Sequence, residues 1–303
     1  MKSIGTTNYR AAFIDAMKRR DAVNIEDAAL GQTPDGFVLP TAAEAAFKAK
    51  QEQYNIFRSL ATVQFINADN KLKTLLPAGD AAFVAEGAAI PEATVGLTSW
   101  TIDPHKIAQI IKVTNETLRD SGFDLESALA ADFGRAFGKV EEDGVINGGG
   151  VSEPYGLLHA SQGAETGATS AAAGTISADD IRSLYFSLGR EYRRNAVWLM
   201  SDTTALLLRT LKDTSGAYLW NGADNTLLGK PVYTSPYMPD TASGEKPVLF
   251  GDLTYYRLVQ RGAATIQPLH ERYAESGITG YLGTEFIDGK LVKREAVKAL
   301  VVA

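Results

Sequence analysis

The side chains best suited to catalysis or metal binding are few in this sequence. Its imidazoles are His105, His159 and His270, and the chain has no cysteine. The lack of cysteine excludes disulfides, thiolate nucleophiles, iron–sulfur clusters and Cys-ligated zinc together. Each histidine stands by itself at a predicted strand edge or loop, without the partners that a metal site or a catalytic triad needs. We therefore expect hydrogen-bonding roles for these histidines and no metal site.

The acidic run Glu141-Glu142-Asp143 could be a carboxylate site for a metal or for acid–base chemistry. Consecutive residues of a helix point in different directions, so these side chains do not converge on one substrate. Charges at a helix end usually face solvent, and the sequence favours such a solvated surface here. The alternative is a soluble hydrolase, which predicts a monomer or small oligomer with a pocket around the run.

Phosphate-binding and other catalytic motifs are also missing. The sequence has no G-x-G-x-x-G, no G-x-x-x-x-G-K-[ST] and no H-E-x-x-H, and Gly229-Lys230 is followed by Pro231 rather than Ser or Thr. Gly148-Gly149-Gly150 follows a predicted helix instead of opening one, so we interpret it as a helix stop and not as an anion site. These patterns predict no enzyme activity, no catalytic residue and no cofactor.

Length and charge narrow the class of protein. The 303 residues can form one large domain or two ordinary ones, and 45% of them are hydrophobic, as in soluble globular chains. The 36 acidic and 30 basic residues give a net charge of -6, which disfavours bulk nucleic-acid binding. No window approaches about 18 consecutive apolar residues, and the first residues show no signal-peptide pattern. Neither a membrane span nor secretion is indicated.

Periodicity and capping signals predict the main helices. Tyr9, Phe13 and Met17 recur every four residues in a helix over 8–20. Thr41 and Glu44 form a T-x-x-E capping box for a helix that runs to about residue 59. After the S-x-x-D signal over 121–124, an apolar stripe predicts the longest helix, with these residues inward: Leu125, Leu129, Phe133, Phe137 and Val140.

From residue 63 to 113 the pattern changes to short strands separated by Pro and Gly. The stretch from Ala78 to Leu97 keeps strand character but is poor in large apolar residues, so it cannot build a core of its own. We expect an extended hairpin that projects from the body and finds partners outside its own fold. Strands and helices then mix without a regular β-α-β rhythm, and Asp288-Gly289 predicts a tight hairpin turn. The fold class is therefore α+β.

The second half of the chain carries a series of motifs in a fixed order. They are Leu211-Lys-Asp-Thr-Ser-Gly-Ala-Tyr-Leu-Trp220, Leu228-Gly-Lys-Pro-Val232, Ser235-Pro-Tyr-Met-Pro239 and Phe250-Gly-Asp252. This combination resembles the major capsid proteins of tailed bacteriophages with the Hong Kong 97 fold. Weaker support comes from Val84-Ala-Glu-Gly87 with Pro91-Glu92, and from Glu153-Pro-Tyr-Gly-Leu157. The resemblance covers almost the whole chain.

The resemblance implies a division of the chain into four regions. Residues 1–65 would be the N-terminal arm, 66–105 the E-loop hairpin, 106–147 with 257–293 the peripheral domain and its long spine helix, and 148–256 with 294–303 the axial domain. Two groups of residues would then serve assembly. The E-loop group is Glu86, Gly87, Ile90, Pro91 and Glu92, and the axial-loop group is Asp213, Thr214, Ser215 and Gly216.

The resemblance also implies a function. The chain would self-assemble into pentamers and hexamers of an icosahedral phage head that encloses double-stranded DNA without sequence-specific binding. A portal and a separate scaffolding protein would be partners, although the short segment before the hairpin also allows assembly without a scaffold. The protein would lie in the virion after assembly in the host cytoplasm. The alternative is an encapsulin-type nanocompartment, which a neighbouring cargo gene and a cargo-binding N-terminal helix would favour.

The sequence departs from the family in one chemical respect. Some members form a covalent mesh by joining a Lys near the E-loop tip to an Asn of a neighbour. This chain has no lysine between Lys73 and Lys106, and no asparagine after Asn225. We therefore predict no autocatalytic cross-link of that kind.

Overall fold

The longest strand, β15 (Ile278–Leu291), is the centre of the larger sheet in the computed structural model. The structure describes residues 7–18, 32–33, 36–66, 71–76, 83, 96–119, 124–212, 216, 218, 220–221 and 225–303. β15 pairs antiparallel with β6 (His105–Thr114) on one side, and with β13 (Tyr256–Arg261) and β14 (Thr265–Leu269) on the other. It is rich in β-branched and aromatic residues, which favour an extended backbone.

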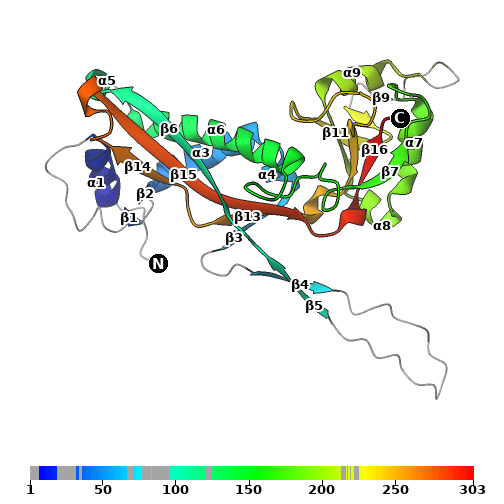
Figure 1. Ribbon diagram of the computed structural model, residues 1–303, viewed down its shortest axis with the longest axis horizontal. Helices are drawn as coiled ribbons and strands as arrows, with labels where there is room; N and C mark the ends of the chain where they lie inside the picture. Colours follow the sequence, from blue (N-terminus) through cyan, green and yellow to red (C-terminus); the bar gives the residue numbers. More distant parts are fainter. Residues whose placement is uncertain are drawn as a thin grey trace.

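Segments from the start of the chain widen this sheet. β3 (Thr62–Ile66) runs parallel to β13, while β2 (Gly36–Val38) pairs antiparallel with β14, and β1 (Gln32–Thr33) with β2. The helices of this half are α1 (Thr7–Lys18), α3 (Thr41–Tyr54), α4 (Phe57–Leu60), α5 (Asn115–Arg119) and α6 (Leu125–Asn147). Figure 1 shows α3 and α6 side by side along the sheet.

Glycines let α3 and α6 approach closely. A Cβ on Gly134 would lie 2.5 Å from the carbonyl oxygen of Phe47, and a Cβ on Gly138 would lie 3.0 Å from that of Gln51. Any larger side chain at Gly134 would force the backbones apart, because both contacts involve main-chain atoms and not flexible side chains. The spacing of these glycines therefore sets the distance between the helices.

The long helix was predicted correctly in place, but not in detail. Leu125, Leu129, Phe133 and Phe137 are buried as expected, whereas Val140 is 54% exposed. An inward row at a spacing of four residues continues to residue 141, which is a buried glutamate, and not to the apolar residue before it. The N-cap is Asp124. Its carboxylate accepts the Ser127 amide, so Asp124 itself caps the start of the helix. The helix also runs through Gly144 and ends at the predicted glycine stop.

The predicted capping box of α3 is not formed. Pro40 is the N-cap residue, Thr41 is the first helical residue, and no side chain caps this end. Glu44 instead pairs with Lys48 at 2.6 Å across one turn. The helix also ends at Tyr54 rather than near residue 59, and α4 begins after a short break. Proline explains the start, because its fixed φ of -59° and its missing amide suit a helix N-terminus.

A second sheet forms the other end of the molecule (Figure 1), and because its strands are shorter it is called the smaller sheet. Its order is β7 (Glu165–Thr169), β16 (Val297–Val301), β12 (Val248–Gly251), β8 (Val197–Met200), β11 (Lys230–Thr234), β10 (Thr226–Leu227) and β9 (Trp220–Asn221). The accompanying helices are α7 (Ala178–Ser187), α8 (Arg190–Arg193) and α9 (Asp202–Thr210), with short 3-10 turns η1 (Leu253–Tyr255), η2 (Ala274–Ser276) and η3 (Arg294–Ala296). Ser177 and Asp180 form a capping box at the start of α7.

The smaller sheet has an apolar and aromatic core. Trp198 and Phe250 stack with ring centroids 4.1 Å apart, and the Tyr185 ring stacks on Phe250 with centroids 5.2 Å apart. A two-residue turn joins β10 to β11, with φ of 49° at Leu228 and 74° at Gly229. Such a turn matches the twist of a hairpin, and glycine adopts it without strain. The Gly-x-Pro-Val motif therefore encodes a hairpin turn followed by a strand.

The predicted hairpin at Asp288-Gly289 is wrong. β15 continues through both residues, and Gly289 pairs with Leu258 of β13. Here glycine permits close packing instead of a turn, because a Cβ at Gly289 would lie 2.4 Å from the Tyr256 hydroxyl oxygen. The Asp288 carboxylate accepts a hydrogen bond from the backbone amide of Asp103. Asp288 therefore has a structural role within the strand and is not a turn residue.

One apolar cluster joins the two ends of the molecule. Phe57 and Tyr256 from the larger half pack with Leu199 and Leu249 from the smaller sheet, and all are buried. The mixture of sheets and helices confirms the α+β class. Within the part of the chain that the structure describes, no helix has the length and apolar character of a membrane span.

Candidate assembly surfaces

A separate hairpin lies at the base of the stretch that was predicted to project, of which only Phe83, Gly96 and Leu97 are among the described residues. It consists of β4 (Lys71–Leu76) and β5 (Gly96–Thr101), which pair only with each other among the described strands (Figure 1). The predicted E-loop residues Glu86, Gly87, Ile90, Pro91 and Glu92 lie outside the described residues. The structure therefore describes the base of the hairpin and leaves the role of its tip a prediction.

The root of the hairpin is fixed to the larger sheet. Ile102 is buried, and the Asp103 amide donates to the Asp288 Oδ2 at 2.8 Å. Burial raises the pKa of Asp288, while the hydrogen bonds from the Asp103 and Gly289 amides oppose that rise. The half-buried Asp288 carboxyl therefore links the segment just before β6 to the end of β15.

A cation holds the same root from the side. The Lys290 ammonium lies 5.2 Å from the ring centre of Trp100 on β5 and 5.1 Å from that of Tyr155. Both distances are within the range of a cation–π contact. Lys290 therefore links the hairpin to the loop that follows α6.

Of the predicted axial-loop residues, the structure describes Gly216. Asp213, Thr214 and Ser215 are outside the described residues, and Gly216 is exposed with a φ of 85°. A glycine suits this left-handed conformation. Lys212 and Tyr218 form a β-bridge around the turn, and the Lys212 ammonium lies 4.8 Å from the Tyr218 ring centre.

Large apolar side chains reach the surface on several elements. Phe65 at the end of β3 is 60% exposed, Phe186 on α7 is 68% exposed, and Leu206 on α9 is 65% exposed. Single exposed apolar residues are common on monomers, but interface cores are enriched in such side chains. We treat these positions as candidate contacts with other subunits. The sequence patterns did not identify them, because each lies in an otherwise ordinary amphipathic element.

Two residues of the acidic run, Glu141 and Glu142, are buried, which corrects the predicted solvated surface for them. The side chains of Glu141 and Glu285 are 0% and 1% exposed, and the Arg58 guanidinium lies between them. Arg58 donates to Glu141 through Nε at 2.9 Å and Nη2 at 2.5 Å, and more weakly to Glu285 at 3.4 Å. This pairing connects α4, α6 and β15 at a point where the sequence gives no sign of charge neutralisation.

Amide side chains complete the buried cluster. Gln51 donates its Nε2 to Glu285 at 2.7 Å and to Glu141 at 3.3 Å, and Asn55 donates its Nδ2 to Glu141 at 2.9 Å. Asn55 also accepts the Phe57 amide, which explains why the helix breaks at this residue. Burial first, and then the nearby charge of Glu141, raises the pKa of Glu285 to about 8. The cluster therefore links the helices to the sheet, and Arg58, Gln51 and Asn55 already donate to its carboxylates.

Glu142 points away from Glu141, as the helix geometry predicted. Its carboxylate accepts the Ile56 amide at 3.2 Å and the Ser235 hydroxyl at 2.5 Å, and burial raises its pKa. Asp143 is exposed. Both oxygens of Glu141 and both of Glu142 already accept donors from the chain, so neither buried carboxylate is free for acid–base chemistry.

The histidines act as hydrogen-bonding residues where the structure describes their contacts. His159 accepts the Gln162 amide at Nδ1, at 3.1 Å, and the His270 Nε2 lies 3.1 Å from the Ala16 carbonyl oxygen. The prediction is confirmed for these two residues. His105 begins β6. Among the described residues, no group of His, Asp and Glu side chains could hold a metal ion.

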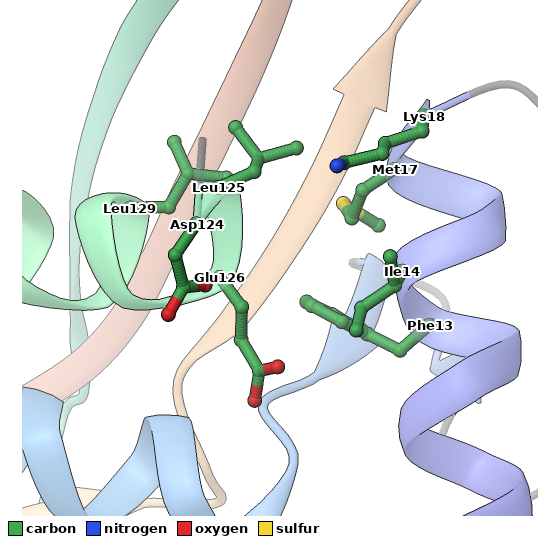
Figure 2. A pocket seen from close by; sticks show the side chains of 8 residues that line it. All are labelled: Phe13, Ile14, Met17, Lys18, Asp124, Leu125, Glu126 and Leu129. Atoms are coloured by element: carbon green, nitrogen blue, oxygen red, sulfur yellow. The ribbon is translucent and has the colours of Figure 1, made fainter. Parts of the chain in front are cut away.

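Helix α1 is fastened to the larger sheet at both ends. The Tyr9 hydroxyl donates to the Val38 carbonyl at 2.5 Å, and the Tyr281 hydroxyl donates to the Met17 carbonyl at 2.8 Å. The Arg10 Nε also donates to Glu126 at 2.8 Å. Between α1 and the first turn of α6 lies a pocket, which Figure 2 shows from close by.

Comparison with known proteins identifies the type of molecule. A sequence profile of the phage capsid family matches residues 35–302. The capsid polyprotein of Pseudomonas phage PAJU2 is 30% identical over 176 residues, which are 55% of this chain and 26% of that protein. The chain therefore spans about a quarter of the length of this curated relative.

Solved capsids have the same fold. The capsid of the native GTA particle matches with a TM-score of 0.69 and 27% identity, covering 94% of this chain and 99% of that chain. The capsid of the empty GTA particle gives 0.70 and 27%, covering 93% and 99%. The Gordonia phage Cozz structure shares the fold with a TM-score of 0.58 at 15% identity, over 82% of this chain and 86% of that chain. Because the profile covers nearly the whole sequence and the folded structure agrees with it, this chain belongs to the phage capsid family.

Proposed function

We propose that this chain is a structural major capsid protein, the repeating subunit of a phage head. The observation that carries the proposal is the agreement with the capsid of the native GTA particle over 94% of this chain and 99% of that chain. A match over nearly the full length of both chains means that the whole architecture is shared, and not one domain. The buried acidic cluster adds support, since the oxygens of Glu141 already accept donors from the chain and serve the fold.

The proposed subunit keeps the four regions that the sequence suggested. Residues 1–65 are the N-terminal arm, 66–105 the E-loop, 106–147 with 257–293 the peripheral domain, and 148–256 with 294–303 the axial domain of a Hong Kong 97-type fold. This division is supported by the two sheets, since the larger one contains β6, β13, β14 and β15 and the smaller one contains β8, β11, β12 and β16.

Assembly would use the two groups of residues named above. The hairpin tip, with Glu86, Gly87 and Pro91 among its residues, would lie across a neighbouring subunit, because strands that pair only with each other gain stability from outside contacts. The axial loop around Gly216 would lie near the axis of a ring of subunits. The exposed Leu206 and Phe186 would add apolar area to contacts within the ring.

The assembled state would be an icosahedral shell of pentamers and hexamers that encloses double-stranded DNA. Repeated modest interfaces between identical subunits can stabilise a closed shell, although no single contact need be strong. The net charge of -6 suits a wall that confines DNA without gripping it. A portal, a separate scaffolding protein and assembly in the host cytoplasm complete the proposal. An encapsulin-type compartment is not favoured, because the family and the named relatives are phage or GTA capsids.

Electron microscopy with light scattering on the purified chain tests the proposal. Closed shells or rings of subunits are expected, with nucleic acid inside particles from infected cells. The measurement should be repeated with any scaffolding protein encoded nearby, because assembly can depend on it. A 32.5 kDa monomer that persists at high concentration in both cases would contradict the proposal.

A further inference from the structure

A groove between α9 and the edge of the smaller sheet has room for a side chain of another molecule. Its buried lining includes Ala205 of α9, Val232 of β11 and Trp220 of β9, the outermost strand of the sheet. The groove has a volume of about 330 Å³, which is at the lower end of the volumes of small-molecule sites. Leu206, which also lines it, is 65% exposed. An incoming apolar group can therefore reach the groove and find space in it.

Two side chains of opposite charge also line the groove. Arg209 has partners in its own chain, because its Nη2 donates to the Asn225 Oδ1 at 2.9 Å and its guanidinium lies 5.0 Å from the Trp220 ring centre. Asp202, in the first turn of α9, is exposed and forms no ion pair with any of the described residues. The charge that remains available at the groove is therefore negative. It favours a partner that carries a cation beside its apolar group.

The other end of the same sheet presents such a group. Phe186 on α7 is 68% exposed, and the Arg193 guanidinium lies 5.4 Å from its ring centre, within the range of a cation–π contact. Arg193 donates through Nε to the Leu188 carbonyl, but within the described part of the chain it forms no ion pair. An exposed ring with a guanidinium beside it matches the groove in both polarity and charge.

The groove and Phe186 lie at opposite ends of one layer of helices. Both α7 and α9 pack into the apolar cluster that covers one face of the smaller sheet, and Figure 1 shows them at this end of the molecule. α7 packs on β7 and β16 at the start of the sheet order, whereas the groove lies beside β11 and β9 at its end. Contact between two different surfaces of identical chains is head to tail, and such contacts close into rings.

We propose that the groove receives the Phe186 side chain of a second copy of this chain, and that Arg193 of that copy pairs with Asp202. The proposal rests on the proposed function, since it names a contact between neighbouring subunits of a ring. The position of the groove agrees with this, because α9 ends at Thr210, just before the proposed axial loop. Packing of Phe186 against Leu206 removes two exposed apolar side chains from water, which favours the contact.

The lack of cysteine in the chain allows a direct test by cross-linking. Ser183 lies three residues before Phe186 on α7, and Thr234 lines the groove, and both are exposed. The double variant Ser183→Cys with Thr234→Cys therefore places one thiol on each surface and keeps Phe186 and Leu206. Assembled particles are treated with a short bis-maleimide, which tolerates a wider spacing than a disulfide, and are separated by denaturing electrophoresis. We expect a ladder of covalent oligomers up to the size of the ring, because each copy is linked to two neighbours.

The single-cysteine variants are the matched controls. A head-to-tail contact needs both thiols, so Ser183→Cys alone and Thr234→Cys alone should stay uncross-linked, while particles assembled from a mixture of the two should give dimers. Dimers in a single-cysteine variant without a ladder in the double variant would show a symmetric contact and overturn the proposal.

Charge reversal tests the ion pair independently. Asp202→Arg should raise the protein concentration needed for assembly about tenfold or more, because Arg193 then meets a like charge. Arg193→Asp should have a similar effect. The variant with both changes should assemble within about twofold of the native concentration, since the pair is restored with its signs exchanged. Circular dichroism verifies that each variant is folded, and additive losses without recovery would overturn the pairing.

Light scattering distinguishes failure of this contact from failure of the proposed function. Shells or rings that give no ladder in the double-cysteine variant would overturn the contact and leave the capsid role intact. A chain that stays monomeric, with and without any scaffolding protein encoded nearby, would overturn both. A ladder in the double-cysteine variant, with recovery in the double charge variant, supports the contact.

Discussion

The two sheets of this protein are stabilised in different ways. Around β15, the helices are tied to the sheet by a buried cluster in which Arg58 lies between Glu141 and Glu285. Around β12, the core consists of apolar residues and the stacked rings of Trp198 and Phe250, and the buried Asp180 carboxylate caps the start of α7 instead of pairing with an arginine. One region depends on directional, charged contacts and the other on apolar packing.

This difference has consequences for specificity and for pH dependence. Apolar packing tolerates small displacements, whereas an ion pair with fixed donors holds its elements in one register. We infer that the charged cluster sets the positions of α4 and α6 against the sheet, as a hypothesis for this fold. It should also make the larger half sensitive to pH, because the pKa of Glu285 is raised to about 8.

The largest effect is expected from Arg58→Met. The substitution leaves buried Glu141 without its counter-charge and should lower the free energy of unfolding by about 3–5 kcal/mol at pH 7. Urea unfolding followed by circular dichroism measures the loss. The double variant Arg58→Met with Glu141→Gln should regain most of it, since the uncompensated charge is then removed. A loss below about 1 kcal/mol, as for a surface ion pair, would show that the cluster is not a structural tie.

Leu300→Ala tests the apolar region in the same way. Leu300 is 0% exposed on β16, so the substitution should cost about 3 kcal/mol through lost burial and the cavity left behind. Because no charge changes, the loss should be the same at pH 5, 7 and 9. Parallel unfolding curves at the three pH values check this. A loss that varies strongly with pH would remove the contrast between the two regions.

Much of the fold could be predicted from local patterns. The capping box of Ser177 and Asp180 and the apolar row of the long helix depend on residues a few positions apart, so they are readable in the sequence. The pairing of β4 with β5 agrees with a hairpin in this part of the chain, while the projecting stretch from Ala78 to Leu97 stays a prediction. The α+β class follows from these elements.

The errors at Asp288-Gly289 and at Glu141 have a common physical cause, which is long-range packing. Asp288-Gly289 has the composition of a turn, but its glycine is required by the Tyr256 hydroxyl and its carboxylate by a distant amide. Likewise, the sequence predicts a solvated Glu141, because its partners Arg58 and Gln51 lie on two other helices, α4 and α3. Glu126 and the pocket beside it could not be predicted either, because α1 reaches α6 only through tertiary contacts. Side-chain partners far apart in the chain leave no local signal.

Glu285→Gln sharpens the comparison by removing the titrating group. Glu285 has a higher pKa in the folded chain, about 8, than the ordinary value of a glutamate near 4.5, so burial opposes its ionisation. Its contribution to stability is therefore fully present below about pH 4.5 and is lost as the pH rises through about 8. The variant should show a flatter pH dependence and be more stable than the native chain by about 1–3 kcal/mol at pH 9.

Unfolding of the native chain and of Glu285→Gln at pH 5, 7 and 9 measures this effect. Leu300→Ala serves as the control, because it lowers stability without changing a charge. Identical pH profiles for the native chain and Glu285→Gln would show that Glu285 does not titrate in this range. The pH sensitivity of the larger half would then need another group.

The smallest effect is expected at the root of the hairpin, where the two kinds of contact meet. Lys290→Met keeps the alkyl length but removes the cation that lies between Trp100 and Tyr155, a change of about 0.5–1 kcal/mol. Global unfolding barely registers such a change, but exchange of the nearby Asp103 amide reports opening of the root directly, and it should become about two- to fivefold faster. Lys112→Met removes a similar contact with Tyr273 at the other end of β6 and should leave that amide unchanged. Equal acceleration in both variants would mean that the sheet opens as one unit. Acceleration in Lys290→Met alone would mean that the hairpin can loosen while β15 and its charged cluster stay closed.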